Sequence, residues 1–191
     1  SVLISPEQDP EPEAPGTLVK MVWAEALLNA GPEVCEGFVV PPTPCDPAWA
    51  MQTGALLQAL RRDLCDGGYT IAGVIESLGD ELPEPDRWAA MARLEALYLA
   101  RLTDAGARDP LSARIERAGS PHVPDGVHRI VVAAVPDPSL LALRALRTLS
   151  ERIPVVVLVH APPSEAARFD EWGRPVPDTA APRFIDIPDE D

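Results

Sequence analysis

Residues 128–162, HRIVVAAVPDPSLLALRALRTLSERIPVVVLVHAP, decide the predicted fold. Two apolar runs, Arg129 to Val135 and Val155 to His160, enclose one leucine-rich segment with helical spacing. The first run is almost entirely Val, Ile and Ala, which is typical of a parallel strand covered on both faces by helices. The stretch therefore predicts a βαβ unit of a parallel sheet, with Ser139 as the N-cap of its helix rather than a nucleophile, because no G-x-S-x-G turn surrounds it.

Asp137 follows the first of these strands, in the place where P-loop ATPases carry the Walker B acid. Its neighbours are Pro136 and Pro138 rather than a second carboxylate, and the sequence contains no G-x-x-x-x-G-K-[ST] loop. One acid without that loop cannot hold Mg-ATP, because the phosphates lack both their N–H cradle and charge compensation. Asp137 is therefore a candidate vestigial Walker B position, and no cofactor or metal is predicted.

A series of helices is expected before the βαβ unit. Apolar spacing, N-cap residues and Gly or Pro stops place them at Thr17–Ala30, Pro47–Cys65, Thr70–Leu78, Asp86–Ala105 and Asp109–Ala118. A first strand and a Pro/Glu linker are expected within residues 1–16. After the βαβ unit, a further helix is expected, followed by a final strand over 183–187. This order predicts an α/β fold: a parallel P-loop or Rossmann-like sheet flanked by helices, with an inserted, mainly helical subdomain over 17–119 and the βαβ-containing part over 120–191.

Apolar stripes predict which helix faces lie in the core. In the first two helices these stripes comprise Leu18, Met21, Val22 and Leu28, and then Leu56, Leu57, Leu60 and Leu64. In the helix from Asp86 the stripe carries Glu95 among apolar residues and includes Trp88 and Tyr98. These two aromatic residues are expected in the core rather than in an exposed platform.

The amino-acid composition limits the kinds of function that this chain can have. The 191 residues with 46% hydrophobic residues suit a globular protein with a substantial core. A net charge of −14 opposes a phosphate backbone, so the chain alone is expected to bind DNA poorly. Cys35, Cys45 and Cys65 lack C-x-x-C spacing, which indicates neither a disulfide framework nor a zinc site. This cysteine content suits a reducing compartment, so a cytoplasmic location is expected. With no membrane-length apolar run and no signal peptide pattern, the chain is expected to be soluble.

Two further groups are candidate site residues. His160, at the end of the second strand, could act as a general base or ligand, but no short spacing pairs it with another histidine, which favours a hydrogen-bonded strand-end role. Asp170, Glu171, Trp172 and Arg174 could form an interaction loop, with Trp172 stacking on a base and Arg174 on phosphate. The alternative, which we favour, is that Trp172 fills the sheet edge while Arg174 pairs with Glu171.

Several segments resemble one family. They are W-x-x-M-x-x-L-E-x-x-Y from Trp88, a later G-x-x-D-P, the two strands ending in Pro-Asp and His-Ala-Pro, and F-D-E-W-G-R-P from Phe169. Together they resemble AddB-like subunits of bacterial ATP-dependent helicase–nucleases, over most of Thr17 to Ile187. The resemblance implies an N-terminal helicase-like module, often without its ATPase motifs, followed by a PD-(D/E)XK nuclease. The start at Ser1 agrees with an internal fragment of that module.

Two functions are therefore open. The resemblance implies a non-catalytic, inactivated ATPase module in DNA repair and recombination, which acts as a scaffold for other domains of its parent, an exonuclease subunit, and for a helicase subunit. DNA would be a partner only in the parent, and no membrane is expected. The acids at the C-terminus, Asp186, Asp189, Glu190 and Asp191, are expected to be a solvated tail rather than the nuclease motif. The alternative is a small α/β enzyme or ligand-binding domain with a site near Asp137, His160 and Pro162.

Overall fold

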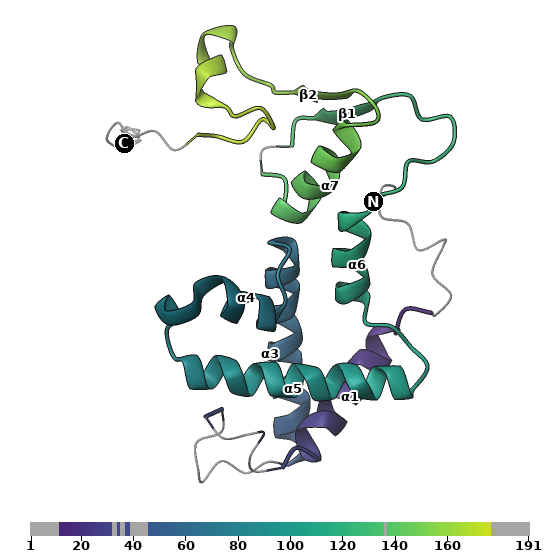
Figure 1. Cartoon of the computed structure of the whole chain (residues 1–191), viewed down its shortest axis with the longest axis vertical. Coiled ribbons are helices and arrows are strands. Elements are labelled where there is room, and N and C mark those ends of the chain that lie inside the picture. The colour runs from purple at the N-terminus through teal and green to yellow at the C-terminus, as the bar shows by residue number, and fades with distance from the viewer. Residues whose placement is uncertain (1–11, 32–33, 35–36, 39–45, 136, 177–191) are drawn as a thin grey trace, which may run out of the picture.

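The structure is a computed structural model that describes residues 12–31, 34, 37–38, 46–135 and 137–176. Helices dominate, and two short strands form a parallel sheet at one end of the molecule (Figure 1). The elements in chain order are α1 (Gly16–Leu28), α3 (Pro47–Asp66), α4 (Ile71–Leu78), η2 (Gly79–Glu81), α5 (Pro85–Asp104), α6 (Pro110–Gly119), β1 (Ile130–Ala133), α7 (Leu140–Ser150), β2 (Val155–Leu158) and η3 (Pro163–Arg168). The protein is thus a helix-rich, mixed α/β structure.

The predicted elements are confirmed wherever the structure describes them, with one change of type. The segment after β2 forms the 3₁₀ helix η3 instead of an α-helix. The strand expected near the N-terminus, the strand expected over 183–187 and the acids of the C-terminal tail lie outside the described residues.

N-cap side chains explain why most helices begin where the sequence predicts. The Asp46 carboxylate accepts a hydrogen bond from the Trp49 N–H at 2.8 Å, and the Asp109 carboxylate accepts one from the Ser112 N–H at 2.8 Å. A proline follows each of these acids as the first helical residue, where a missing N–H costs nothing. Ser139 caps α7 by accepting from the Ala142 N–H at 3.2 Å, which confirms its predicted role.

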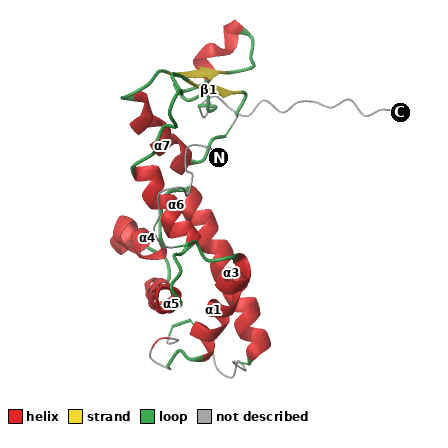
Figure 2. Cartoon of the chain, turned by 90° about the vertical axis from the view of Figure 1, so that its right-hand side faces the viewer, coloured by secondary structure: helices red, strands yellow, loops and turns green. Residues whose placement is uncertain are grey.

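The largest core lies where α1, α3 and α5 cross (Figure 2). The rings of Trp23 and Tyr98 stack there, with centroids 4.2 Å apart and planes 5° from parallel. Gly54 permits this approach of α1 to α3, because a Cβ at this position would lie 2.8 Å from the Cβ of Trp23. The glycine in the middle of α3 therefore lies at a point where the two helices pack closely.

Three predicted core positions are wrong. Met21, Leu28 and Leu56 are 67%, 43% and 71% exposed, although each belongs to an apolar stripe. Their neighbours Val22, Leu27 and Leu57 are buried instead. The contact between Trp23 and Gly54 sets the rotation of α1 and α3, and it turns Met21 and Leu56 outward.

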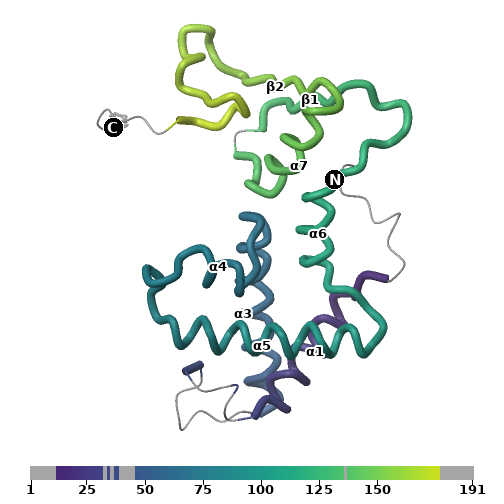
Figure 3. Tube along the Cα trace, viewed as in Figure 1, coloured from purple at the N-terminus to yellow at the C-terminus, as the bar shows by residue number. Residues whose placement is uncertain are grey.

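The βαβ unit forms a second core, at the end of the molecule opposite the crossing of α1, α3 and α5 (Figure 3). Strand β1 pairs with β2 in parallel, with Ile130 opposite Val155 and Ala133 opposite Leu158. Side chains alternate along each strand, so one face packs on α7 and the other faces away from it. The face on α7 comprises Ile130, Val132, Val155 and Val157, which pack on Leu143, Leu146 and Trp172.

The opposite face of the sheet is not covered by any described element. Val131, Val156 and Leu158 are 52%, 37% and 53% exposed in the described structure. The prediction that helices cover both faces is therefore wrong for the described residues. The run of valines could not distinguish the two cases, because it places apolar side chains on both faces.

A small cluster joins the two regions. Cys65 of α3 and Ala118 of α6 pack on Leu141 and Ala145 of α7, and all four side chains are buried. Helix α7 therefore contacts the helical region on one side and the sheet on the other. Among the described residues, no helix is both long enough and apolar enough to cross a lipid bilayer.

Candidate functional site

The carboxyl ends of the two strands place Asp137 and His160 near the same edge of the sheet. Ala133 pairs with Leu158, so the two strands end side by side. β1 then turns at Ala134, whose φ of +49° is unusual for a residue with a side chain. Asp137 and His160 are both exposed, and neither forms a hydrogen bond or ion pair in the described part of the chain.

In the part of the chain that the structure describes, this strand edge carries no cluster of metal-binding side chains. Among the residues the structure describes, His, Cys, Asp and Glu nowhere gather in a group of three or more that could hold a metal ion. The oxygen of Ser139 is occupied in capping α7. Within the described ranges, Asp137 therefore has no metal-binding partner, and the sequence supplies no phosphate loop for it.

The predicted interaction loop is a closed turn built around Asp170. Its carboxylate accepts hydrogen bonds from the backbone N–H groups of Trp172 and Arg174, both at 2.9 Å, and from the Arg174 guanidinium at 2.8 Å. The backbone bond from Arg174 is the largest of the effects that hold the pKa of Asp170 below its usual value. The predicted pairing of Arg174 with Glu171 is wrong. The turn brings the Arg174 backbone N–H to the Asp170 carboxylate, and the Arg174 guanidinium therefore pairs with that same carboxylate.

Trp172 points inward from this turn. It is 8% exposed, packs on the α7 face of the sheet, and donates from its indole nitrogen to Glu171 at 2.7 Å. Gly173 has a φ of +76°, and a Cβ there would lie 2.9 Å from a methyl of Val159. This packing agrees with the favoured alternative, in which Trp172 fills the sheet and is not free to stack on a base.

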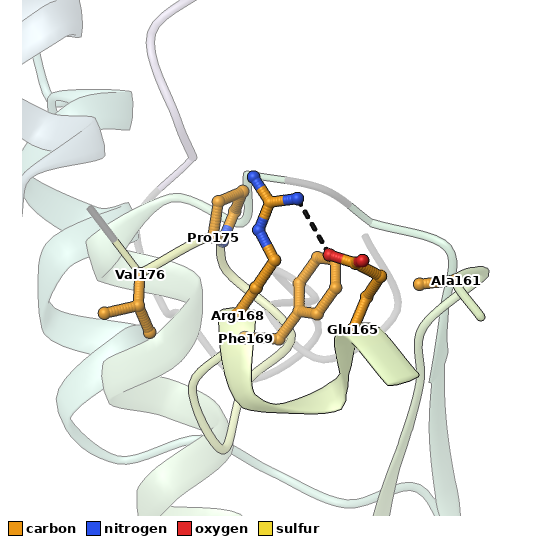
Figure 4. Close-up of a pocket in the computed structure, with 6 residues that line it drawn as sticks. All are labelled: Ala161, Glu165, Arg168, Phe169, Pro175 and Val176. Carbon is orange, nitrogen blue, oxygen red and sulfur yellow. Dashed lines mark hydrogen bonds and ion pairs between the residues drawn. The ribbon is translucent and has the colours of Figure 1, made fainter. Parts of the chain in front are cut away.

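A shallow hollow of about 310 Å³ lies beside η3, next to the carboxyl end of β2 (Figure 4). Glu165 and Arg168 form an ion pair at 2.8 Å at its rim, and Phe169 lies beside them. The remaining lining residues are Ala161, Pro175 and Val176. Neither Asp137 nor His160 lines the hollow, so it does not join the two predicted site residues.

The most strongly interacting polar residues lie elsewhere, inside the helical region. The Arg61 guanidinium donates to both carboxylate oxygens of Asp109 at 2.9 Å and to Glu95 at 2.6 Å. The Tyr98 hydroxyl donates to Asp109 at 2.7 Å. The side chains of the three charged residues are only 1% to 6% exposed. The group therefore links α3, α5 and the start of α6, and it is closed to a ligand.

Mutual compensation keeps Arg61 and Asp109 charged although both are buried. Burial alone would lower the pKa of Arg61, but its bonds to Asp109 and Glu95 raise it above the ordinary value. Burial alone would raise the pKa of Asp109, but Arg61 holds it below its usual range. Burial, followed by the adjacent Asp109 carboxylate, raises the pKa of Tyr98. We therefore interpret the cluster as structural, because each charge is used by another residue of the chain.

The sequence signals part of this cluster. Glu95 stands within the apolar stripe of α5, and a carboxylate among core positions indicates a buried cationic partner. The identity of that partner was missed, because Arg61 lies 34 residues away on another helix.

No family model, no curated protein and no solved structure matches this chain. The resemblance to AddB-like subunits therefore stays a prediction from the residues quoted above.

Proposed function

We propose that this chain is a non-catalytic scaffold and interaction module with a sheet of the helicase-like, P-loop type that has lost its nucleotide site. The observation that carries the non-catalytic part is the strand edge at Asp137 and His160. Both side chains are exposed and unpartnered among the described residues, and no metal-binding group surrounds them. The strongest polar interactions serve the helical core instead.

The cellular context in this proposal comes from the resemblance. AddB-like subunits imply a role in processing DNA double-strand breaks, in which the sheet would continue into further strands of a parent chain and α1 to α6 would be an insertion. The partners would be other domains of that parent and a helicase subunit. DNA would be bound through other parts, since the charge of −14 is unfavourable for phosphate contacts.

Calorimetry with Mg-ATP tests the non-catalytic part. We expect no detectable heat of binding to the wild type, because the phosphates would find neither an N–H cradle nor a lysine. Asp137→Ala is the test variant, and Asp63→Ala, which removes an exposed acid from α3, is its matched control. Micromolar binding that Asp137→Ala abolishes and Asp63→Ala keeps would overturn the proposal.

One observation favours the alternative of a small ligand-binding domain. The hollow beside η3 lies at the carboxyl end of β2, which is where open α/β sheets bind ligands. In the same calorimetric experiment, nucleotide binding that survives Asp137→Ala and is lost on Phe169→Ala would assign the ligand to this hollow and support the alternative.

A further inference from the structure

The outward face of the β1–β2 sheet, formed by Val131, Val156 and Leu158, has no partner in the described structure. Parallel strands are normally covered on both faces, because their side chains are apolar on both sides. Here α7 covers one face, and the valines and leucine of the other face remain between 37% and 53% exposed.

The dimensions of this face fit one helix. Two strands spaced by about 4.8 Å present a face about 10 Å wide, which is the diameter of an α-helix with its side chains. Strands of four residues are about 13 Å long, a length that a helix covers in about nine residues. α7, with 11 residues, covers the opposite face of the same strands in this way.

Charge disfavours a second copy of the chain as the occupant. Two copies would bring together two net charges of −14.

Charge at one end of the face indicates the polarity of the occupant. Arg129 directly precedes β1 and, by the alternation of the strand, lies on the same side as Val131. Arg152 lies in the turn before β2, at the same end of the sheet. Both arginines are exposed, and in the described part of the chain neither has an ion pair or hydrogen bond. Carboxylates of an occupant would pair with them.

We propose that this face docks an amphipathic helix of a partner domain or subunit, with an aliphatic stripe over Val131, Val156 and Leu158 and acidic residues at the end that meets Arg129 and Arg152. Acids at the amino end of the helix fit best, because they also interact favourably with the helix dipole. The inference rests on the proposed interaction function and states the chemistry of the partner.

An NMR titration of the full chain with two synthetic peptides tests the docking. The first is a 14-residue helix with leucines on one face and three glutamates in its first turn, and the second carries lysines in place of the glutamates. We expect amide shifts at Val131, Val156 and Leu158 on adding the acidic peptide, with about fivefold weaker binding of the lysine peptide, as exposed ion pairs of this kind provide.

Two variants locate the site. The double variant Arg129→Glu/Arg152→Glu changes exposed, unpaired side chains, so it should fold normally and prefer the lysine peptide. Val156→Lys should abolish the shifts of both peptides. Equal affinity for the two peptides in the wild type, or shifts confined to another surface, would overturn the proposal.

Analytical ultracentrifugation without peptide tests whether a second copy of the chain covers the face. A dimer that Val156→Lys dissociates would mean that a second copy covers the face, and would also overturn the proposal. The two experiments fail independently. If neither peptide binds, the docking proposal is wrong and the proposed non-catalytic function still stands. If Mg-ATP binds, the proposed function is wrong whatever the peptides do.

Discussion

The helical region and the βαβ unit satisfy their side chains in opposite ways. In the helical region, even the charged residues Arg61, Glu95 and Asp109 are buried and paired with one another. In the βαβ unit, apolar residues such as Val131 remain exposed, and Arg129 has no partner in the described structure. In the helical region the buried charges thus find their partners within the chain, whereas in the βαβ unit apolar and cationic groups on one face of the sheet stay exposed.

Removal of Arg61 should cause the largest loss of stability. Arg61→Ala leaves two buried carboxylates without their cation, and we expect the free energy of unfolding to fall by about 3–5 kcal/mol. Chemical denaturation measures this loss. Arg152→Ala is the matched control, since Arg152 is exposed and unpaired among the described residues, and its effect should stay within about 0.5 kcal/mol. A similar cost for both variants would mean that the cluster is not buried in solution.

Acid should weaken the helical region through Asp109. Its pKa is lowered in the folded state, so its stabilising contribution is complete above the ordinary carboxyl pKa of about 3.9 and is lost as the pH falls through the lowered value. Denaturation curves at pH 5 and at several pH values below 4 measure this dependence. Asp109→Asn should be less stable at pH 5 and should lose less of its remaining stability on acidification. An unchanged slope in this variant would exclude Asp109 as the titrating group.

The smallest effect is expected on the open face of the sheet. Val156→Ser replaces a side chain that is 37% exposed, and the change in unfolding free energy should be below about 1 kcal/mol. Val157→Ser, one residue along on the α7 face, is the matched control and should cost more, because Val157 packs on the core that contains Trp172. Equal losses would show that the two faces are equally covered in solution, and would remove the contrast between the regions.

The local elements were predictable because their signals are local. Asp46 and Asp109 each stand before a proline, and that pair of residues defines a helix start without any tertiary contact. Burial was less predictable, because it depends on how helices meet. Met21 and Leu56 fall on apolar stripes, yet the approach of α1 to α3 at Gly54 turns them outward.

The candidate site was predictable only as positions along the chain. Asp137 and His160 were placed at the ends of adjacent strands, which the parallel pairing of β1 and β2 bears out. Whether they meet a ligand depends on groups distant in sequence, and no spacing rule supplies those. The turn at Asp170 shows the same limit, since its loop was identified but the partner of Arg174 was not.

The buried stripe of α3 aligns the helical region with the βαβ unit. Gly54, Leu57, Arg61 and Cys65 follow one another at intervals of three or four residues, and they contact in turn Trp23, the helical core, the ion cluster and the base of α7. Each residue of an α-helix adds a rotation of about 100°. A single residue inserted between Leu57 and Cys65 would therefore turn one end of the helix out of alignment with the other, so the length of α3 fixes the orientation of the sheet relative to the helical region.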